Sequence, residues 1–143
     1  MEVRKPLTPD TPKVIRTHGV LFCNDDLHVN TSLETHDINI YGELSIEGSL
    51  TSRHVTTAGS LDVQGSINAD GHRINVEGDL LCGADCNCHS ICSNGYVLIG
   101  GNCFCIGIDA ADDVCILGTF NNPIENIKVP ENKHIYINGK CVK

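Results

Sequence analysis

Nine cysteines and seven histidines are the residues of this 143-residue chain best suited to chemistry. Five of the cysteines lie close together in the sequence, at positions 82, 86, 88, 103 and 105. Thiolates at such spacing can hold a soft metal ion or pair as disulfides. Stacked imidazoles suit a transition metal or a pH switch. The candidate metal ligands are therefore His36, His72, His89, Cys86 and Cys103.

A repeat in the sequence gives most of these cysteines a different interpretation. Apolar residues alternate with polar residues and glycine in seven copies of one pattern. The copies are 17 or 19 residues apart and begin at Leu21, Ile38, Val55, Ile74, Ile91, Ile108 and Ile127. A period of two predicts β-strands. Three short strands per copy, with glycine between them, predict one coil of a single-stranded parallel β-solenoid.

The predicted fold is therefore an all-β triangular β-helix of about seven coils of 17–19 residues. The handedness of parallel crossovers favours a right-handed coil. The extra residues at 70–73 and 123–126 should lie at corners, where insertions are tolerated. Side chains at equivalent positions of successive coils should form inward columns. The predicted core columns contain Leu44, Leu61, Leu80, Val97, Val114, Ile46, Val63, Ile99 and Ile116.

The same register predicts where the nine thiols point. Seven fall on inward columns, namely Cys23, Cys82, Cys86, Cys88, Cys103, Cys105 and Cys141, and only Cys92 and Cys115 point outward. Free cysteine packs like a small apolar residue. We expect core packing here, with a buried metal or a disulfide as alternatives. Unpaired thiols also predict a reducing compartment, either the cytoplasm or a virion assembled in one.

An enzyme is not expected, and no cofactor is predicted. Asp109, Asp112 and Asp113 could bind Ca²⁺ or act as paired carboxylates, but the predicted turns of two to four residues cannot build a substrate cleft. No phosphate-binding glycine loop or hydrolase motif is present in the sequence. The histidines at the predicted corner are expected to be solvated, because no carboxylate stands at ligand spacing beside them.

Charge and hydropathy exclude two further classes of protein. The net charge is −8, and residues 21–127 hold fifteen acidic residues against Arg53 and Arg73, which argues against nucleic-acid binding. No stretch is long and apolar enough to predict a transmembrane segment, and the first residues do not resemble a signal peptide. We expect residues 1–20 to form an extended, proline-containing arm and residues 21–143 to form the β-helix domain.

The pattern Ile38-x-Ile40-x-Gly42-x-Leu44-x-Ile46-x-Gly48-x-Leu50, with its echoes at Val55, Ile74 and Ile91, resembles the bactofilins. These are polymer-forming cytoskeletal proteins of bacteria, and the likeness covers about residues 21–143. The resemblance implies a right-handed triangular β-helix that polymerises end to end without nucleotide.

The expected function is therefore structural, as a self-assembling cytoskeletal or scaffold element. Two alternatives are a structural component of a virus or phage, and a small metal- or ligand-binding solenoid. The expected partner is a second copy or another structural protein, bound at the ends of the rod, where an uncovered coil exposes strand edges and apolar side chains. The predicted assembly interface consists of Ile135, Ile137 and Cys141 at one end and Val14 and Ile15 at the other.

Overall fold

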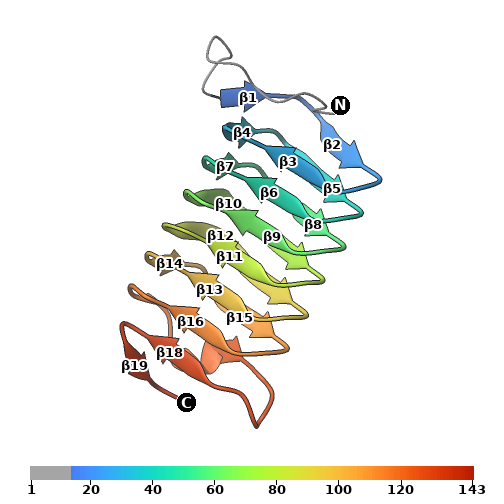
Figure 1. The fold of residues 1–143 in the computed structure, drawn as a ribbon. Coiled ribbons are helices and arrows are strands. Elements are labelled where there is room, and N and C mark those ends of the chain that lie inside the picture. The colour runs from blue at the N-terminus through green and yellow to red at the C-terminus, as the bar shows by residue number, and fades with distance from the viewer. Residues whose placement is uncertain (1–13) are drawn as a thin grey trace.

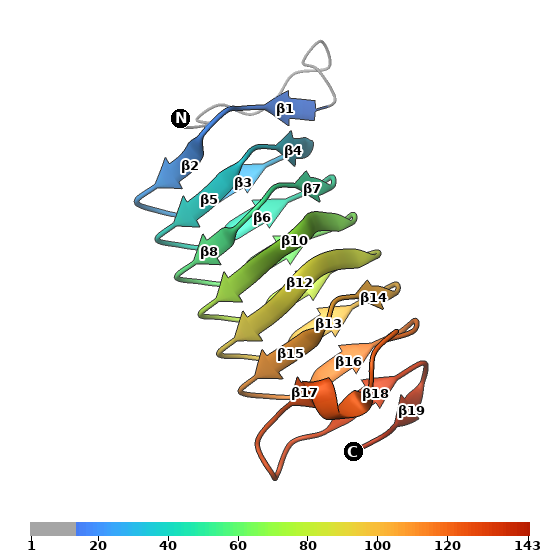
Figure 2. The same ribbon diagram turned by 180° about the vertical axis from the view of Figure 1, so that it is seen from behind.

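The structure, a computed structural model, describes residues 14–143, which form a β-solenoid of about seven turns (Figure 1). Three faces surround one narrow core. Face A contains β2 (Val20–Cys23), β5 (Asp37–Ile40), β8 (Val55–Thr57), the second part of β10 (Ile67–Val76), the second part of β12 (Cys86–Ser93), β15 (Gly107–Ala110) and β17 (Ile127–Lys128). Figure 2 shows these strands stacked in chain order.

Face B is a sheet of eight strands that runs the length of the molecule. Its strands, in spatial order, are β3 (Leu27–Val29), β6 (Leu44–Ile46), β9 (Leu61–Val63), β11 (Leu80–Cys82), β13 (Val97–Ile99), β16 (Val114–Ile116), β18 (Ile135–Ile137) and β19 (Lys140–Cys141). All neighbours in this sheet are parallel except the last pair, β18 and β19.

Face C contains β1 (Val14–Arg16), β4 (Ser32–Glu34), β7 (Leu50–Thr51), the first parts of β10 and β12, and β14 (Cys103–Phe104). Because β10 and β12 continue round the corner between faces C and A, these two faces form one hydrogen-bonded sheet of eleven strands. The triangular solenoid predicted from the repeat is thus confirmed. β1 pairs with β4, so the described solenoid begins at Val14 and not at residue 21.

The core columns are filled as the alternation predicts, and every predicted core-column residue is buried. Leu44, Leu61, Leu80, Val97 and Val114 are directly paired along face B, each with no measurable exposure. The fully buried part of this narrow core is filled by aliphatic and other small side chains, in keeping with an aromatic content of only 4%.

The glycines at the corners serve a purpose other than the one the sequence indicates. Among the described residues, positive φ occurs at Gly19, Gly71, Gly139 and Asn138. The repeated glycines such as Gly59 and Gly78 have ordinary φ, but a Cβ there would press against the backbone of the preceding coil. These corners therefore need glycine because stacked coils approach closely, not because the backbone is left-handed.

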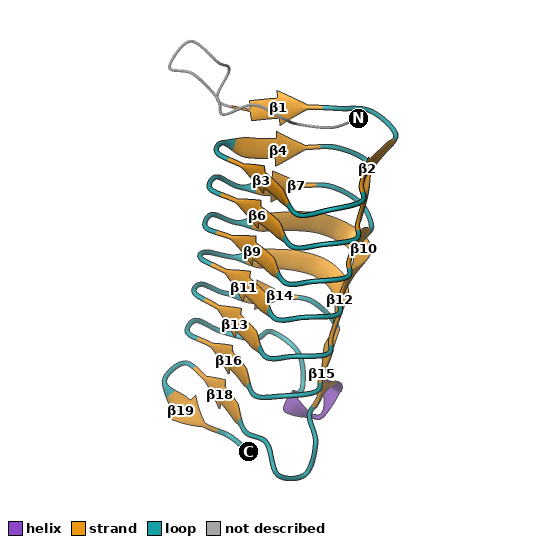
Figure 3. Cartoon of the chain, turned by 45° about the vertical axis from the view of Figure 1, so that its right-hand side comes forward, coloured by secondary structure: helices purple, strands orange, loops and turns teal. Residues whose placement is uncertain are grey.

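The inserted residues lie at corners between faces C and A, as predicted. The first insertion is a bulge in β10, between Ala69 and Arg73, with Gly71 at a φ of 73°. The second contains the 3₁₀ helix η1 (Ile124–Asn126), the purple element in Figure 3. No helix in residues 14–143 has the length and hydropathy to cross a membrane.

The C-terminal end differs from the predicted last coil. Asn138 and Gly139 both have positive φ, so the chain turns back and β19 pairs antiparallel with β18. The Ile135 amide donates to the Lys143 carbonyl oxygen at 3.1 Å, and the Ile135 carbonyl accepts from Val142 at 2.8 Å. The edge of β18 is therefore covered, and Cys141 is exposed rather than inward, which corrects the predicted register there.

Candidate functional site

The cysteine cluster lies inside the solenoid. It extends from the end of face B along face C toward the corner with face A. Cys82, Cys86, Cys88, Cys103 and Cys105 are all buried, and sulfur contacts link them in the order Cys82, Cys86, Cys88, Cys105 and Cys103. The two closest sulfur atoms are those of Cys103 and Cys105, with Sγ–Sγ at 3.2 Å. β12 and β14 bring the cysteines of two successive coils together, because their parallel register places Cys86 beside Cys103. All nine cysteines are free thiols.

Hydrogen bonds between the thiols raise the pKa of some of these cysteines and lower the pKa of others. The hydrogen bond to Cys82, with burial, raises the pKa of Cys86, and hydrogen bonds to Cys105, with burial, raise the pKa values of Cys88 and Cys103. The pKa of Cys105 is lowered, because its sulfur accepts hydrogen bonds from Cys103 and Cys88. Cys105 is thus the most readily ionised member of a cluster that solvent hardly reaches, and the cluster's main contribution is packing.

The predicted metal ligands are not assembled. Within residues 14–143, no group of three or more histidine, cysteine, aspartate or glutamate side chains has a geometry that could hold a metal ion. The imidazoles meet in pairs, His18 with His36 at 5.7 Å and His54 with His72 at 4.9 Å between ring centroids. Arg53 stands between His36 and His72 in the corner row, and its amide donates to the His36 carbonyl.

Most acidic residues at the corners join one coil to the next. Asp85 Oδ1 accepts the Asn102 amide at 2.8 Å, Asp79 Oδ1 the Tyr96 amide at 3.0 Å, and Asp113 Oδ1 the His134 amide at 2.8 Å. Asp112 lies in the same corner, where the Asp113 amide and then the Lys133 ammonium lower its pKa. These contacts give the aspartates a structural use, which sequence reasoning did not find although the spacing of 17 residues in the Asp79 and Asp85 contacts signals it.

The residues predicted for the assembly interface lie near the two ends of the rod. Ile15 is half-buried on β1, and the backbone of Val14 pairs with Ser32 on β4. At the opposite end Ile135 is buried, Ile137 is half-buried and Cys141 is exposed. Phe120 and Val129, which were not predicted, accompany Ile137 as partly buried apolar residues packed against the core.

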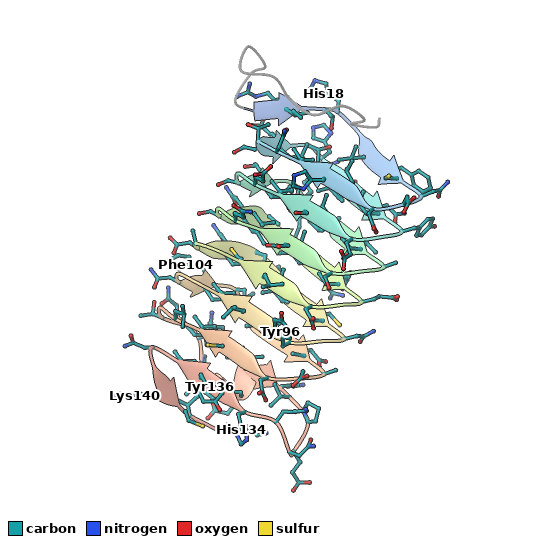
Figure 4. All side chains as sticks on the ribbon, viewed as in Figure 1. His18, Tyr96, Phe104, His134, Tyr136 and Lys140 are labelled. Atoms are coloured by element: carbon teal, nitrogen blue, oxygen red, sulfur yellow. The ribbon has the colours of Figure 1, made fainter. Side chains whose placement is uncertain are left out.

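A second surface was missed from sequence: an apolar area on the C-terminal half of face B. We define it as the leucine patch, formed by Leu81, Leu98, Leu117, Tyr96 and Tyr136. Figure 4 labels both tyrosines, which line a hollow of about 440 Å³ with Leu98. The signal was present in the repeat, because leucine occupies outward positions 81, 98 and 117 where earlier coils carry polar residues.

Comparison with known proteins identifies no relative of this chain. No family model, curated protein or solved structure matches it. The function must therefore be inferred from the solenoid and its surfaces.

Proposed function

We propose that this chain is a non-catalytic structural protein that assembles with other copies through the ends of its rod, in the manner of the bactofilins that its repeat resembles. The observation that carries the proposal is the partial exposure of apolar side chains in the last coil. Ile137 continues the column of Ile99 and Ile116, which have no measurable exposure, yet Ile137 itself is only half-buried.

The other two faces end in the same way. Phe120 continues the column of the fully buried Cys103, and Val129 that of the buried Ala110, but both remain partly exposed. Each face thus offers one apolar side chain at the C-terminal end, where a further coil would bury it. In a solenoid each coil is stabilised mainly by its neighbours, so a second molecule stacked here would replace the missing coil.

Strand edges support the same proposal. Among the described residues, β1 and β2 at one end and β17 at the other each pair with a single strand. Such edges are templates for further pairing, although the short β19 and its lysines limit pairing on face B. Free energy from end contacts would come from backbone hydrogen bonds on faces A and C together with the three apolar side chains.

The test is the concentration dependence of assembly, by sedimentation velocity and negative-stain microscopy. Ile137→Lys places a charge in the apolar end and should reduce end-to-end oligomers. Thr56→Lys, at an exposed position on the middle of face A, adds the same charge and is the matched control. Oligomers larger than a dimer in the parent and the control, and few of them in Ile137→Lys, support the proposal. Equal oligomerisation in all three, or none in the parent, overturns it.

A further inference from the structure

The outward surface of face B changes character halfway along the rod. On β3, β6 and β9 the central outward residues are His28, Ser45 and Asp62. On β11, β13, β16 and β18 the same row continues as Leu81, Leu98, Cys115 and Tyr136. Four successive strands therefore expose an uncharged row in a chain whose net charge is −8. Such an exposed apolar area marks an interaction surface.

The neighbouring row combines a hollow with a projection. Gly83 and Gly100 follow β11 and β13 and have no side chain, and Leu117 follows β16. The glycines, with Leu81 and Leu98, line a hollow of about 280 Å³, and Leu117 stands at its end with 56% of its side chain exposed. A Cβ at Gly83 would run into the Gln64 carbonyl oxygen, so the hollow cannot easily be filled by mutation at that position.

A projection beside a hollow can make the surface complementary to itself. We propose that two copies of this chain pair through face B, with their rods antiparallel and a two-fold axis that lies in the interface and runs along β13. Leu117 lies two coils, or roughly 10 Å, from Gly83 at the far end of the hollow. In this arrangement Leu117 of each copy therefore enters the space over Gly83 of the other. Leu98 faces its own counterpart at the axis, as an isologous interface requires.

Charge at the two ends of face B fits the same arrangement. Glu43, Glu47 and Asp62 lie on or beside β6 and β9, and Lys140 and Lys143 lie on or beside β19. A two-fold axis at β13 sets β19 of one copy opposite β6 of the other, because each is three strands from β13 in the sheet order. Lys143 of one copy then lies at the level of the β6 strand of the other in both halves, whereas Lys140 pairs directly with the inward-facing Ile137 and does not face the partner. A parallel pairing would instead set like charges together.

The acidic residues inside the patch do not oppose this pairing strongly. Asp79 and Asp113 would approach each other across the axis, but the Tyr96 and His134 amides hold their carboxylates within the sheet. The eight strands span roughly 34 Å at the usual strand spacing, which supports an interface of modest size. We therefore expect a weak, reversible dimer. This surface is separate from the rod ends, so the inference does not depend on end-to-end assembly.

The test uses the full chain with Cys92, Cys115 and Cys141, the three cysteines that are not buried, changed to serine. Leu98→Cys in this background should form a covalent dimer on oxidation with copper phenanthroline, and Thr56→Cys should not. Leu81→Cys should cross-link only when the native Cys115 is restored, because Leu81 of one copy faces Cys115 of the other. Circular dichroism checks that each variant is folded.

The outcomes separate this inference from the proposed function. A band at dimer mass for Leu98→Cys alone, with no larger ladder, supports face pairing. Leu98→Glu should weaken non-covalent dimerisation by about tenfold or more, because like charges meet at the axis. Equal cross-linking of Leu98→Cys and Thr56→Cys, or Leu81→Cys cross-linking without Cys115, overturns the antiparallel pairing. Ile137→Lys should leave the Leu98→Cys dimer unchanged whether or not rods assemble end to end.

Discussion

Inward and outward residues of one strand should differ sharply in their contribution to stability. Leu80 has no measurable exposure, while its neighbour Leu81 lies on the half-buried outer surface of β11. Leu80→Ala should lower the free energy of unfolding by about 3 kcal/mol, because a void is left in a close-packed column. Leu81→Ala, the matched control, should cost less than about 1 kcal/mol. Urea denaturation measures both, and similar losses would show that the register is wrong.

The buried thiols should make stability depend on alkaline pH. The raised pKa of Cys86 means that its thiol stays neutral in the folded chain after it has ionised in the unfolded chain. Its contribution is complete below the ordinary thiol pKa of about 8.5 and is lost as pH rises above it. The penalty of Cys86→Ala should therefore be smaller at pH 10 than at pH 7, by about 1–2 kcal/mol.

Paired denaturation curves at the two pH values measure this change. Cys92→Ala, at an exposed cysteine on the outer surface of β12, is the matched control and should show the same difference from the parent at both values. A Cys86→Ala penalty that is constant from pH 7 to pH 10 would contradict a shielded thiol and would indicate that solvent reaches the column.

At the scale of the element, β19 acts as a cap for face B. Deleting residues 138–143 removes the two hydrogen bonds between Ile135 and the C-terminal strand and exposes the edge of β18. We expect more aggregation, measured by light scattering, because an open edge of a sheet recruits other chains. Gly139→Ala keeps the strand but strains the turn at a φ of 78°, and should give an intermediate effect. Unchanged scattering after the deletion would contradict the capping role.

The coils could be predicted because the repeat fixes both period and register. The alternation correctly places the core column from Leu44 to Val114, the inserted corners, and six of the seven cysteines predicted to be inward. The last hairpin could not be read from the same signal, since Ile135 and Ile137 alternate equally well in a coil or a hairpin. The Asn138-Gly139 pair, typical of a tight hairpin turn, was the local clue.

The surfaces were less predictable than the core for a physical reason. Alternation distinguishes inward from outward residues, but it does not show which outward residues gather on one face. Leu98 and Leu117 become neighbours of one hollow only once the corner glycines and the coil spacing are known. The candidate metal ligands are close in the sequence pattern but are not brought together in the structure. His36 and His72 share a row but are separated by Arg53, and the cysteines lie inside the core.

The whole molecule is a rod with two kinds of contact surface. Its C-terminal end leaves Ile137, Phe120 and Val129 partly exposed, and its face B carries the leucine patch between acidic and basic ends. End contacts lengthen an assembly, whereas a two-fold face contact closes after two copies. A chain that uses both would form paired filaments, and loss of either surface should change the shape of the assembly in a characteristic way.

Small-angle X-ray scattering across a concentration series is the most direct test of this structural role. In the parent, the maximum dimension should grow with concentration well beyond that of a single rod, whose face B spans roughly 34 Å. Ile137→Lys should stop this growth but keep the larger cross-section of a pair, and Leu98→Glu should reduce the cross-section but keep the growth. A parent that stays the size of one rod at every concentration would contradict the account.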